Sequence, residues 1–244
     1  MTGPTLTVHR AADRFHTATD WLDSWHSFSF GPHRDPTNVG HGLLVVSNDD
    51  VIAPGTGFGT HPHRDMEILT WVLDGALEHR DSEGNHGILE PGLAQRMSAG
   101  RGIRHSEHNA SRTAPLRLVQ MWVLPDTPGI DPGYEQAWMG DRLAGGALVP
   151  IASGRGHEGA ITLHQRDAVC HVGRLAPGGV ATVPAAPHAH VYVARGAVTL
   201  VPGPGEPGEP VDLAEGDAAR LTGADGVGLT AGGVGAEVIV WETT

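Results

Sequence analysis

The apolar residues of the chain fall into short runs that turn-forming residues separate. Within 68–73 (ILTWVL) both alternating faces are largely apolar, which predicts a strand buried on both sides, and Asp74-Gly75 is the turn signal that ends it. Leu6 and Val8 alternate with polar residues near the start and predict an edge strand. Four further runs of strand length lie at 42–48, 76–80, 93–98 and 116–124. These runs are too short for typical helices, so the pattern predicts an all-β protein of many short strands.

The second half of the chain repeats the pattern of the first half. Segment 188–198 parallels segment 65–77, and segment 215–222 parallels segment 91–98. The matched positions include Trp71 with Tyr192, Gly75 with Gly196, and Gly92 with Gly216. Self-similarity of this kind predicts two copies of one fold unit.

We therefore expect two modules joined by a long connector. The N-terminal module would span 1–124 and the C-terminal module 160–244. The segment 125–159 between them carries Pro, Gly and Asp signals and shows little periodicity, apart from a possible helical turn near 140–144. A connector of this length is unusual inside one compact unit, which favours the division into two modules.

Composition and charge narrow the functional classes. All 16 basic residues are arginine, which excludes Schiff-base and lysine-base chemistry, and the net charge of −12 argues against broad nucleic-acid binding. Cys170 is the only cysteine, so disulfides within the chain and thiolate zinc fingers are excluded. The first residues lack the apolar stretch of a signal peptide, and no apolar run reaches the ~18 residues of a membrane helix. We therefore expect a cytoplasmic protein.

Two pairs of metal-type ligands lie on either side of the buried run 68–73. His61 and His63 form the first pair, and His105 and Glu107 form the second. Residues two apart point to the same face of a strand, so each pair can aim two ligands at one point if the two strands are neighbours. Three imidazoles and one carboxylate suit iron, manganese, nickel, copper or zinc better than calcium or magnesium.

Glu67 competes with Glu107 for the fourth position. It has the same strand parity as His63, but at roughly 3.3 Å per residue it would lie about 13 Å further along a straight strand. A bulge or turn would be needed to bring it to the metal. Glu107 needs no such distortion, so we prefer it.

The remaining histidines of interest are not expected to bind the metal. His108 has the opposite strand parity to its neighbours His105 and Glu107. The pair formed by His188 and His190 has no second pair downstream, so we expect the C-terminal module to lack a metal site. His79 and His86 are likewise left without a role.

Aromatic residues are concentrated in the segment 21–30, which carries two Trp and two Phe. One interpretation is that they plug the end of a barrel. The alternative is that some of them line a pocket for a planar aromatic substrate.

These motifs resemble those of the pirin family of the cupin superfamily. The first cupin motif, Gly, five residues, His-x-His and then Glu, is met by Gly55, His61, His63 and Glu67. The second motif ends in Gly, two residues, His, three residues and Asn, and is met by Gly102, His105 and Asn109. The segments most typical of pirins are HPHRDMEILTWVLDGALEHRDSEGN, QRMSAGRGIRHSEHN and WHSFSFG. Gly100 stands where many cupins have proline.

The resemblance implies a bicupin of two antiparallel jelly-roll β-barrels. One divalent metal ion, most often Fe²⁺ in pirins, would be held in the N-terminal barrel by His61, His63, His105 and Glu107. The C-terminal barrel would have lost its ligands. Asp65 and Asn109 are candidates for hydrogen bonds to the free ring nitrogens of the ligands.

Two functions from different classes follow from this resemblance. In the first, the protein is a quercetin 2,3-dioxygenase-like enzyme that acts on a small aromatic substrate and O₂, with Glu107 as a catalytic proton acceptor. In the second, it is a redox-responsive metal-binding module that regulates a protein partner. An enzyme for another small substrate stays open, because fold likeness alone does not decide function.

Overall fold

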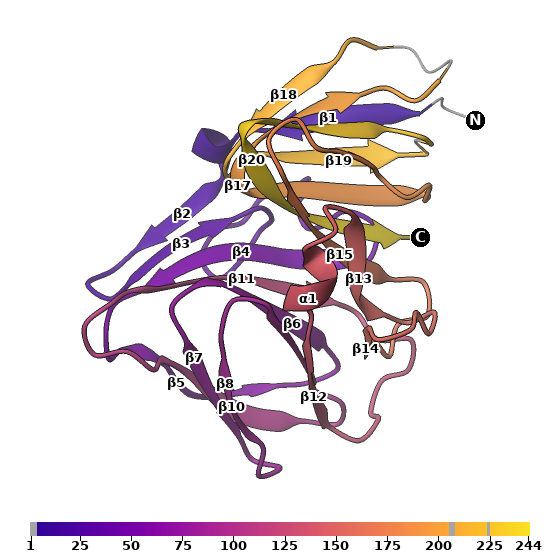
Figure 1. Ribbon diagram of the computed structural model, residues 1–244. Coiled ribbons are helices and arrows are strands. Elements are labelled where there is room, and N and C mark those ends of the chain that lie inside the picture. The colour runs from indigo at the N-terminus through magenta and orange to yellow at the C-terminus, as the bar shows by residue number, and fades with distance from the viewer. Residues whose placement is uncertain (1–3, 205–207, 224) are drawn as a thin grey trace.

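The computed structural model describes residues 4–204, 208–223 and 225–244, which form three β-sheets and two short helices (Figure 1). The seven-stranded sheet has the order β12 (Gly133–Trp138), β9 (Leu93–Ser98), β6 (Glu67–Asp74), β11 (Leu116–Val123), β4 (Leu44–Ile52), β3 (Leu22–His26) and β2 (Phe15–Ala18). The four-stranded sheet has the order β5 (Gly57–His63), β10 (Ile103–Asn109), β7 (Leu77–Asp81) and β8 (His86–Leu89). These two sheets make up the N-terminal half.

The C-terminal half is built on a nine-stranded sheet, drawn mainly in orange and yellow in Figure 1. Its path runs through β1 (Thr5–His9), β19 (Ala218–Thr222), β17 (His188–Val201), β20 (Gly228–Thr243), β15 (Val169–Leu175), β13 (Leu148–Ser153) and β14 (Ile161–Thr162). β16 (Val180–Thr182) pairs with β20, and β18 (Val211–Ala214) pairs with β17. The helices are a 3-10 turn at Ala11–Asp13 and α1 at Gly140–Leu143.

The all-β prediction is confirmed, and the pairing is antiparallel apart from β13 with β14 in the described residues. The sheets are open rather than closed, so the halves are jelly-roll-like sandwiches and not the closed barrels that the resemblance implied. Six strands lie where apolar runs or alternation predicted them, namely β1, β4, β6, β7, β9 and β11, with β4 extending beyond its predicted run 42–48. In the part of the chain that the structure describes, no helix is both long enough and apolar enough to cross a membrane.

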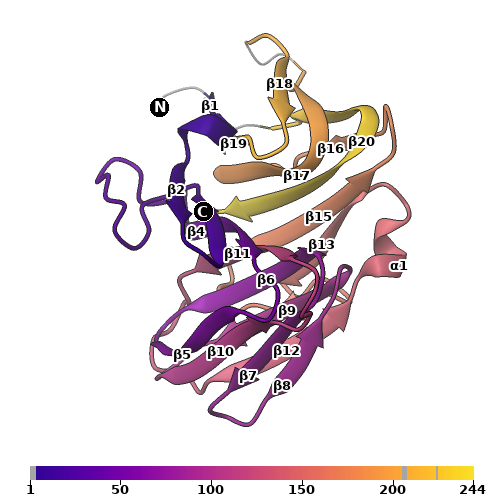
Figure 2. The same cartoon turned by 90° about the vertical axis from the view of Figure 1, so that its left-hand side faces the viewer.

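The strand pairing does not follow the module boundaries that we expected. β1 pairs with β19 of the C-terminal sheet, and Figure 2 shows it beside that strand at the top of the molecule. The physical reason is that Leu6 and Val8 pack against the core of the C-terminal half. Segment 125–159 contains two strands, β12 on the N-terminal sheet and β13 on the C-terminal sheet, in addition to the expected helical turn at α1.

The two halves share a hydrophobic core. One face of β6 places Leu69, Trp71 and Leu73 against residues such as Ile239 and Trp241 of β20. The opposite face of the strand belongs to the cores inside the N-terminal half. β6 is therefore covered on both sides, as its doubly apolar sequence predicted.

The internal repeat is visible in the strand register. Trp71 of β6 lies opposite Ala94 of β9, and Tyr192 of β17 lies opposite Ala218 of β19. The turn before each second strand has a glycine with positive φ, +100° at Gly92 and +85° at Gly216. The two halves therefore contain the same strand unit, and the sequence match between them has a structural basis.

Candidate metal centre and pocket

The candidate ligands come from three neighbouring strands of the four-stranded sheet. β10 pairs with β5 on one side, which places His105 opposite His61. It pairs with β7 on the other side, which places Glu107 opposite His79. The pairing of β5 with β10 is the condition under which the two sequence motifs can meet, and the structure fulfils it.

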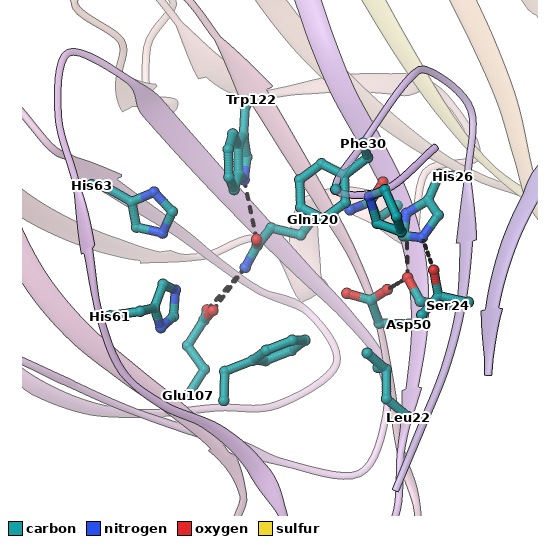
Figure 3. A pocket seen from close by; sticks show the side chains of 15 residues that line it. Leu22, Ser24, His26, Phe30, Asp50, His61, His63, Glu107, Gln120 and Trp122 are labelled. Atoms are coloured by element: carbon teal, nitrogen blue, oxygen red, sulfur yellow. Dashed lines mark hydrogen bonds between the residues drawn. The ribbon is translucent and has the colours of Figure 1, made fainter. Parts of the chain in front are cut away.

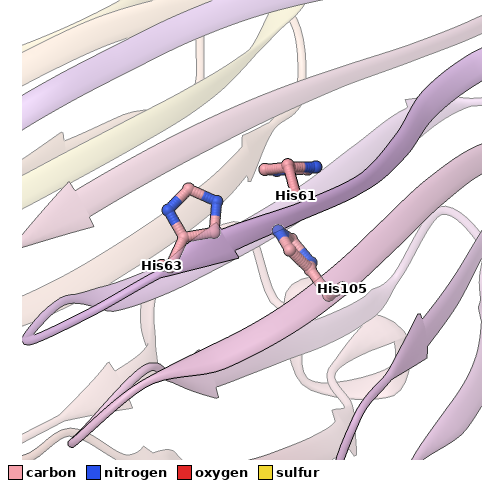
Figure 4. Close-up of side chains that lie close together, drawn as sticks. All are labelled: His61, His63 and His105. Carbon is pink, nitrogen blue, oxygen red and sulfur yellow. The ribbon is translucent and has the colours of Figure 1, made fainter.

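His61, His63 and His105 converge on one point (Figure 4). One ring nitrogen from each of them lies within 4.8 Å of the others, and the ring centroids of His61 and His105 are 4.4 Å apart. His61 and His63 lie on β5, and His105 reaches them from β10. Three imidazoles at this separation are a set of donors that a divalent transition metal can use.

The environment of His105 fits a bound metal ion. Its side chain is 1% exposed, yet both of its ring nitrogens lack a hydrogen-bond partner. Burial, together with the neighbouring His61 and His79, lowers the pKa of His105 to about 3. Burial also lowers the pKa of His63 to about 4, and His105 and His61 contribute to this change. Neutral imidazoles with free lone pairs are the form that binds a metal.

Glu107 is held in place by the side-chain amide of Gln120. Gln120 Nε2 donates hydrogen bonds to both Glu107 carboxylate oxygens, at 3.1 and 2.9 Å. Trp122 Nε1 donates to Gln120 Oε1 at 3.1 Å, which fixes the amide so that its nitrogen points at Glu107 (Figure 3). Glu107 belongs to a second group of possible ligands, formed with His79 and His105, so His105 links the two groups.

His79 is the residue of this centre that the sequence analysis missed. It is fully buried on β7, where Asp81 Oδ2 lies 3.2 Å from its Nε2, and Gln95 Nε2 lies 3.4 Å from its Nδ1. Leu77, His79 and Asp81 alternate along the strand, and Leu77 is fully buried as well. That alternation with an apolar residue was the signal that could have placed His79 on the inner face.

The contacts that support the ligand rings differ from those expected. A backbone carbonyl supports one of the rings, because Gly59 O lies 2.8 Å from His61 Nδ1. The prediction that Asp65 and Asn109 support the rings is wrong. Asn109 Nδ2 donates to three backbone carbonyls, those of Ile52, Ala53 and Ala114. Asp65 accepts a hydrogen bond from the Gly129 backbone N–H. Both polar side chains hold loops in place instead.

Glu67 lies outside both groups of possible ligands that the described residues form. It is buried at the start of β6, where its Oε2 accepts a hydrogen bond from the His164 backbone N–H at 3.0 Å. His190 is buried against the Phe28 ring in the C-terminal half, and His188 lies against the His41 ring. No group of metal ligands in the described ranges contains His108, His188 or His190.

A cavity of about 310 Å³ adjoins the candidate ligands in the N-terminal half (Figure 3). His61, His63 and Glu107 lie on one side of it, and Phe58, Leu22, Phe30 and Trp122 add apolar surface. The segment 21–30 therefore contributes to the wall of a pocket, which was the second of the two roles that we considered. Phe30 lines the cavity, whereas Phe28 is buried in the core between the halves.

Comparison with known proteins agrees with this geometry. A family model described as Pirin matches residues 8–123. A Mycobacterium tuberculosis protein provisionally named a quercetin 2,3-dioxygenase is 55% identical over 239 residues, which cover 98% of this chain and 95% of the relative. An Escherichia coli quercetin 2,3-dioxygenase is 50% identical over 158 residues, 65% of this chain and 67% of the relative. The E. coli bacterial pirin YhhW, solved in complex with nickel(II), has 36% identity and a TM-score of 0.87, with 98% of this chain and 99% of that chain covered.

These matches confirm the family expected from the sequence motifs. The chain is similar over nearly its whole length to proteins named as quercetin 2,3-dioxygenases, which are oxidoreductases. It is also similar in fold and sequence to a pirin solved with a divalent metal ion. The chain belongs to the pirin family.

Proposed function

We propose that the protein is an iron-dependent dioxygenase that opens the ring of a flavonol such as quercetin. The observation that carries this proposal is the convergence of three imidazoles, two of which line a largely apolar cavity together with the Glu107 carboxylate. The names of the similar proteins support the choice of reaction and substrate class. The cavity of about 310 Å³ and its aromatic walls suit a flat, largely apolar ligand.

The metal would be held by His61, His63, His105 and Glu107. The unpartnered ring nitrogens of His105 support this assignment, since buried polar atoms without partners are costly unless a ligand satisfies them. When bound, the metal would act as a Lewis acid and bring O₂ close to the oxygen atoms of the substrate. Iron is our choice among the divalent metals because the donor set suits it and because pirins most often use it.

Glu107 has a second role in this proposal, as the acceptor of the proton from the substrate hydroxyl. It is the only acidic member of the proposed ligand set, and a base must lie within hydrogen-bond reach of the proton that it removes. Gln120, oriented by Trp122, keeps the carboxylate turned toward the cavity. Phe30 and Trp122 would position the planar substrate and exclude water from it.

The proton role is tested by oxygen uptake of Glu107→Gln, expressed per bound iron. We expect a decrease of about 10²- to 10⁴-fold, because the amide cannot accept the proton and general-base catalysis typically contributes this much. Glu83→Gln, in an exposed turn, is the control and should match the unsubstituted protein. Unchanged turnover per bound iron in Glu107→Gln would refute the proton role.

The partner-binding alternative makes a different prediction for the same protein. Under this alternative, the protein binds iron but shows no substrate-dependent oxygen uptake, and its affinity for a protein partner changes with the iron oxidation state. That combination of results would favour the partner-binding alternative over catalysis.

A further inference from the structure

Asp50 is a second carboxylate on the wall of the cavity, on a different sheet from Glu107. It lies on β4 opposite Ser24 of β3, and the Ser24 hydroxyl donates a hydrogen bond to Asp50 Oδ1. The residue is 4% exposed. Figure 3 shows Asp50 and Ser24 on one side of the cavity, with His61 and His63 on the other.

The hydrogen bonding of Asp50 differs from that of the other buried acids. Its neighbour Asp49, on the opposite face of β4, accepts two hydrogen bonds from Arg117 and one from Tyr192. The other buried acids in the described ranges each accept at least one hydrogen bond from a nitrogen donor; they are Glu67, Glu107, Asp217, Glu237 and Glu242. Asp50 has the Ser24 hydroxyl alone, and no ion pair of the described residues includes it.

With a single hydrogen-bond donor, the buried Asp50 carboxyl group has little to stabilise its charged form. Burial raises the pKa of Asp50 to about 7; the Ser24 hydrogen bond opposes this, and the charges of Asp49 and Glu107 add to it. A buried acceptor with so few donors gains more than an exposed one from a donor that a ligand brings. The side chain faces a cavity to which Leu22, Phe58 and Phe30 add apolar surface, and whose polar lining residues include His26 and Asn48. The missing donor can therefore come from a ligand in the cavity.

We propose that Asp50, positioned by Ser24, binds a hydroxyl group of the substrate at the end that lies away from His61 and His63. The proposal rests on the proposed function and narrows its substrate class. The substrate would be a planar aromatic with one set of oxygen atoms toward the histidines and at least one further hydroxyl on the opposite part of the molecule. Asp50 would thus determine specificity among flavonols rather than take part in ring opening.

The test compares two flavonols that differ in their outer hydroxyl groups. Quercetin carries them, and 3-hydroxyflavone lacks them but keeps the oxygen atoms proposed to face the metal ligands. Binding is measured by titration without oxygen, on iron-loaded protein, for the unsubstituted chain and for Asp50→Asn. The control is Asp23→Asn, which removes the same charge from an exposed position on β3, where the Asp23 side chain is 54% exposed.

At pH 8, where the Asp50 carboxyl group is mostly ionised, the unsubstituted protein should bind quercetin about tenfold to a hundredfold more tightly than 3-hydroxyflavone, the range expected for a hydrogen bond to a charged group. Asp50→Asn should lose most of this preference by weakening quercetin alone, and Asp23→Asn should retain it. Ser24→Ala, which leaves the carboxylate but removes its positioning donor, should lie between them. Full retention of the preference in both Asp50→Asn and Ser24→Ala would overturn the inference.

Oxygen uptake separates this inference from the proposed function. We call the proposed role of Asp50 in binding the outer hydroxyl group the anchor. If quercetin binds with an Asp50-dependent preference but causes no oxygen uptake, the anchor is supported and the dioxygenase proposal fails. If uptake occurs and the preference is independent of Asp50, the dioxygenase proposal stands and the anchor is refuted. Failure of both flavonols to bind would refute the anchor as well as the choice of substrate.

Discussion

At the residue scale, the alternation of side chains along a strand predicted which of the candidate ligands lie together, but it did not identify His79 or Asp50. The proximity of His105 and Glu107 could be predicted because their spacing places both on one strand face, and β10 does bring them into one group of possible ligands. His79 could not be identified in the same way, because its only nearby signal was alternation with Leu77. Asp50 could not be singled out either, since the apolar cavity around it is formed by several separate strands.

The raised pKa of Asp50 leads to a prediction about how pH affects the stability of the fold. In the unfolded chain its pKa is near the ordinary value of 3.8, and in the folded protein burial raises it to about 7. As the pH rises, Asp50 therefore loses its proton at a lower pH in the unfolded chain than in the folded protein. Its contribution lowers the free energy of unfolding progressively between pH 3.8 and about pH 7. Asn at this position carries no such cost. We expect the free energy of unfolding of Asp50→Asn, relative to the unsubstituted protein, to rise by about 2–3 kcal/mol from pH 5 to pH 8.

Urea denaturation of the metal-free proteins at the two pH values provides the measurement. Asp23→Asn, at an exposed position, should show no comparable change. Parallel pH profiles for Asp50→Asn and the unsubstituted protein would show that the Asp50 carboxyl group ionises normally in the folded state.

At the element scale, the approach of β5 to β10 depends on a glycine. A Cβ atom on Gly57 would lie 2.2 Å from the Glu107 carbonyl oxygen and 2.5 Å from the His108 Cα, and both of these are backbone atoms that cannot rotate away. Gly59, on the same strand, has no atom within 4 Å of its Cβ position. The two glycines are therefore a matched pair for testing how strictly the register of the centre is fixed.

We expect Gly57→Ala to displace β5 from β10, to weaken iron binding by at least about tenfold and to lower stability by about 1–3 kcal/mol, as overpacking typically does. Gly59→Ala should leave both quantities nearly unchanged. Iron affinity and thermal stability of the two variants provide the measurement. Equal behaviour of the two would mean that the close contact at Gly57 does not hold the ligand strands in place.

Elements with a clear hydrophobic pattern could be predicted, and those without one could not. β6, β9 and β11 have runs of apolar residues that pack in the cores, and the predicted ranges lie within a residue or two of the observed ones. β12 was not predicted. Its first five residues are all half-buried, so the strand has no alternation of buried and exposed positions. Its pairing with β9 is determined by the neighbouring strand rather than by its own pattern.

At the scale of the whole molecule, the internal repeat predicted two related halves but not how they are joined. The shared core shows that the outer face of the N-terminal sheet packs against the C-terminal sheet. Trp71 Nε1 also donates a 2.7 Å hydrogen bond to Glu237 Oε1 across this contact. β1 extends the connection, because the start of the chain belongs to the C-terminal sheet.

These contacts predict that the two halves unfold together. Calorimetry of the metal-free protein should show one transition, and Trp71→Phe should lower its temperature by about 2–6 °C through the lost hydrogen bond. Trp138→Phe, at a position 56% exposed, should have little effect. Two separate transitions, or a shift confined to one part of the unfolding profile, would contradict this coupling.

The most direct test of the proposed function is oxygen uptake by iron-loaded protein given quercetin, with the iron content of each sample measured. We predict substrate-dependent uptake by the unsubstituted protein and by His108→Ala, whose residue lies beside Glu107 but outside the groups of candidate ligands. His105→Ala, which removes the residue shared by both groups, should lose iron and show no uptake. Absence of uptake in protein shown to contain iron, or persistent uptake in His105→Ala, would contradict the proposal.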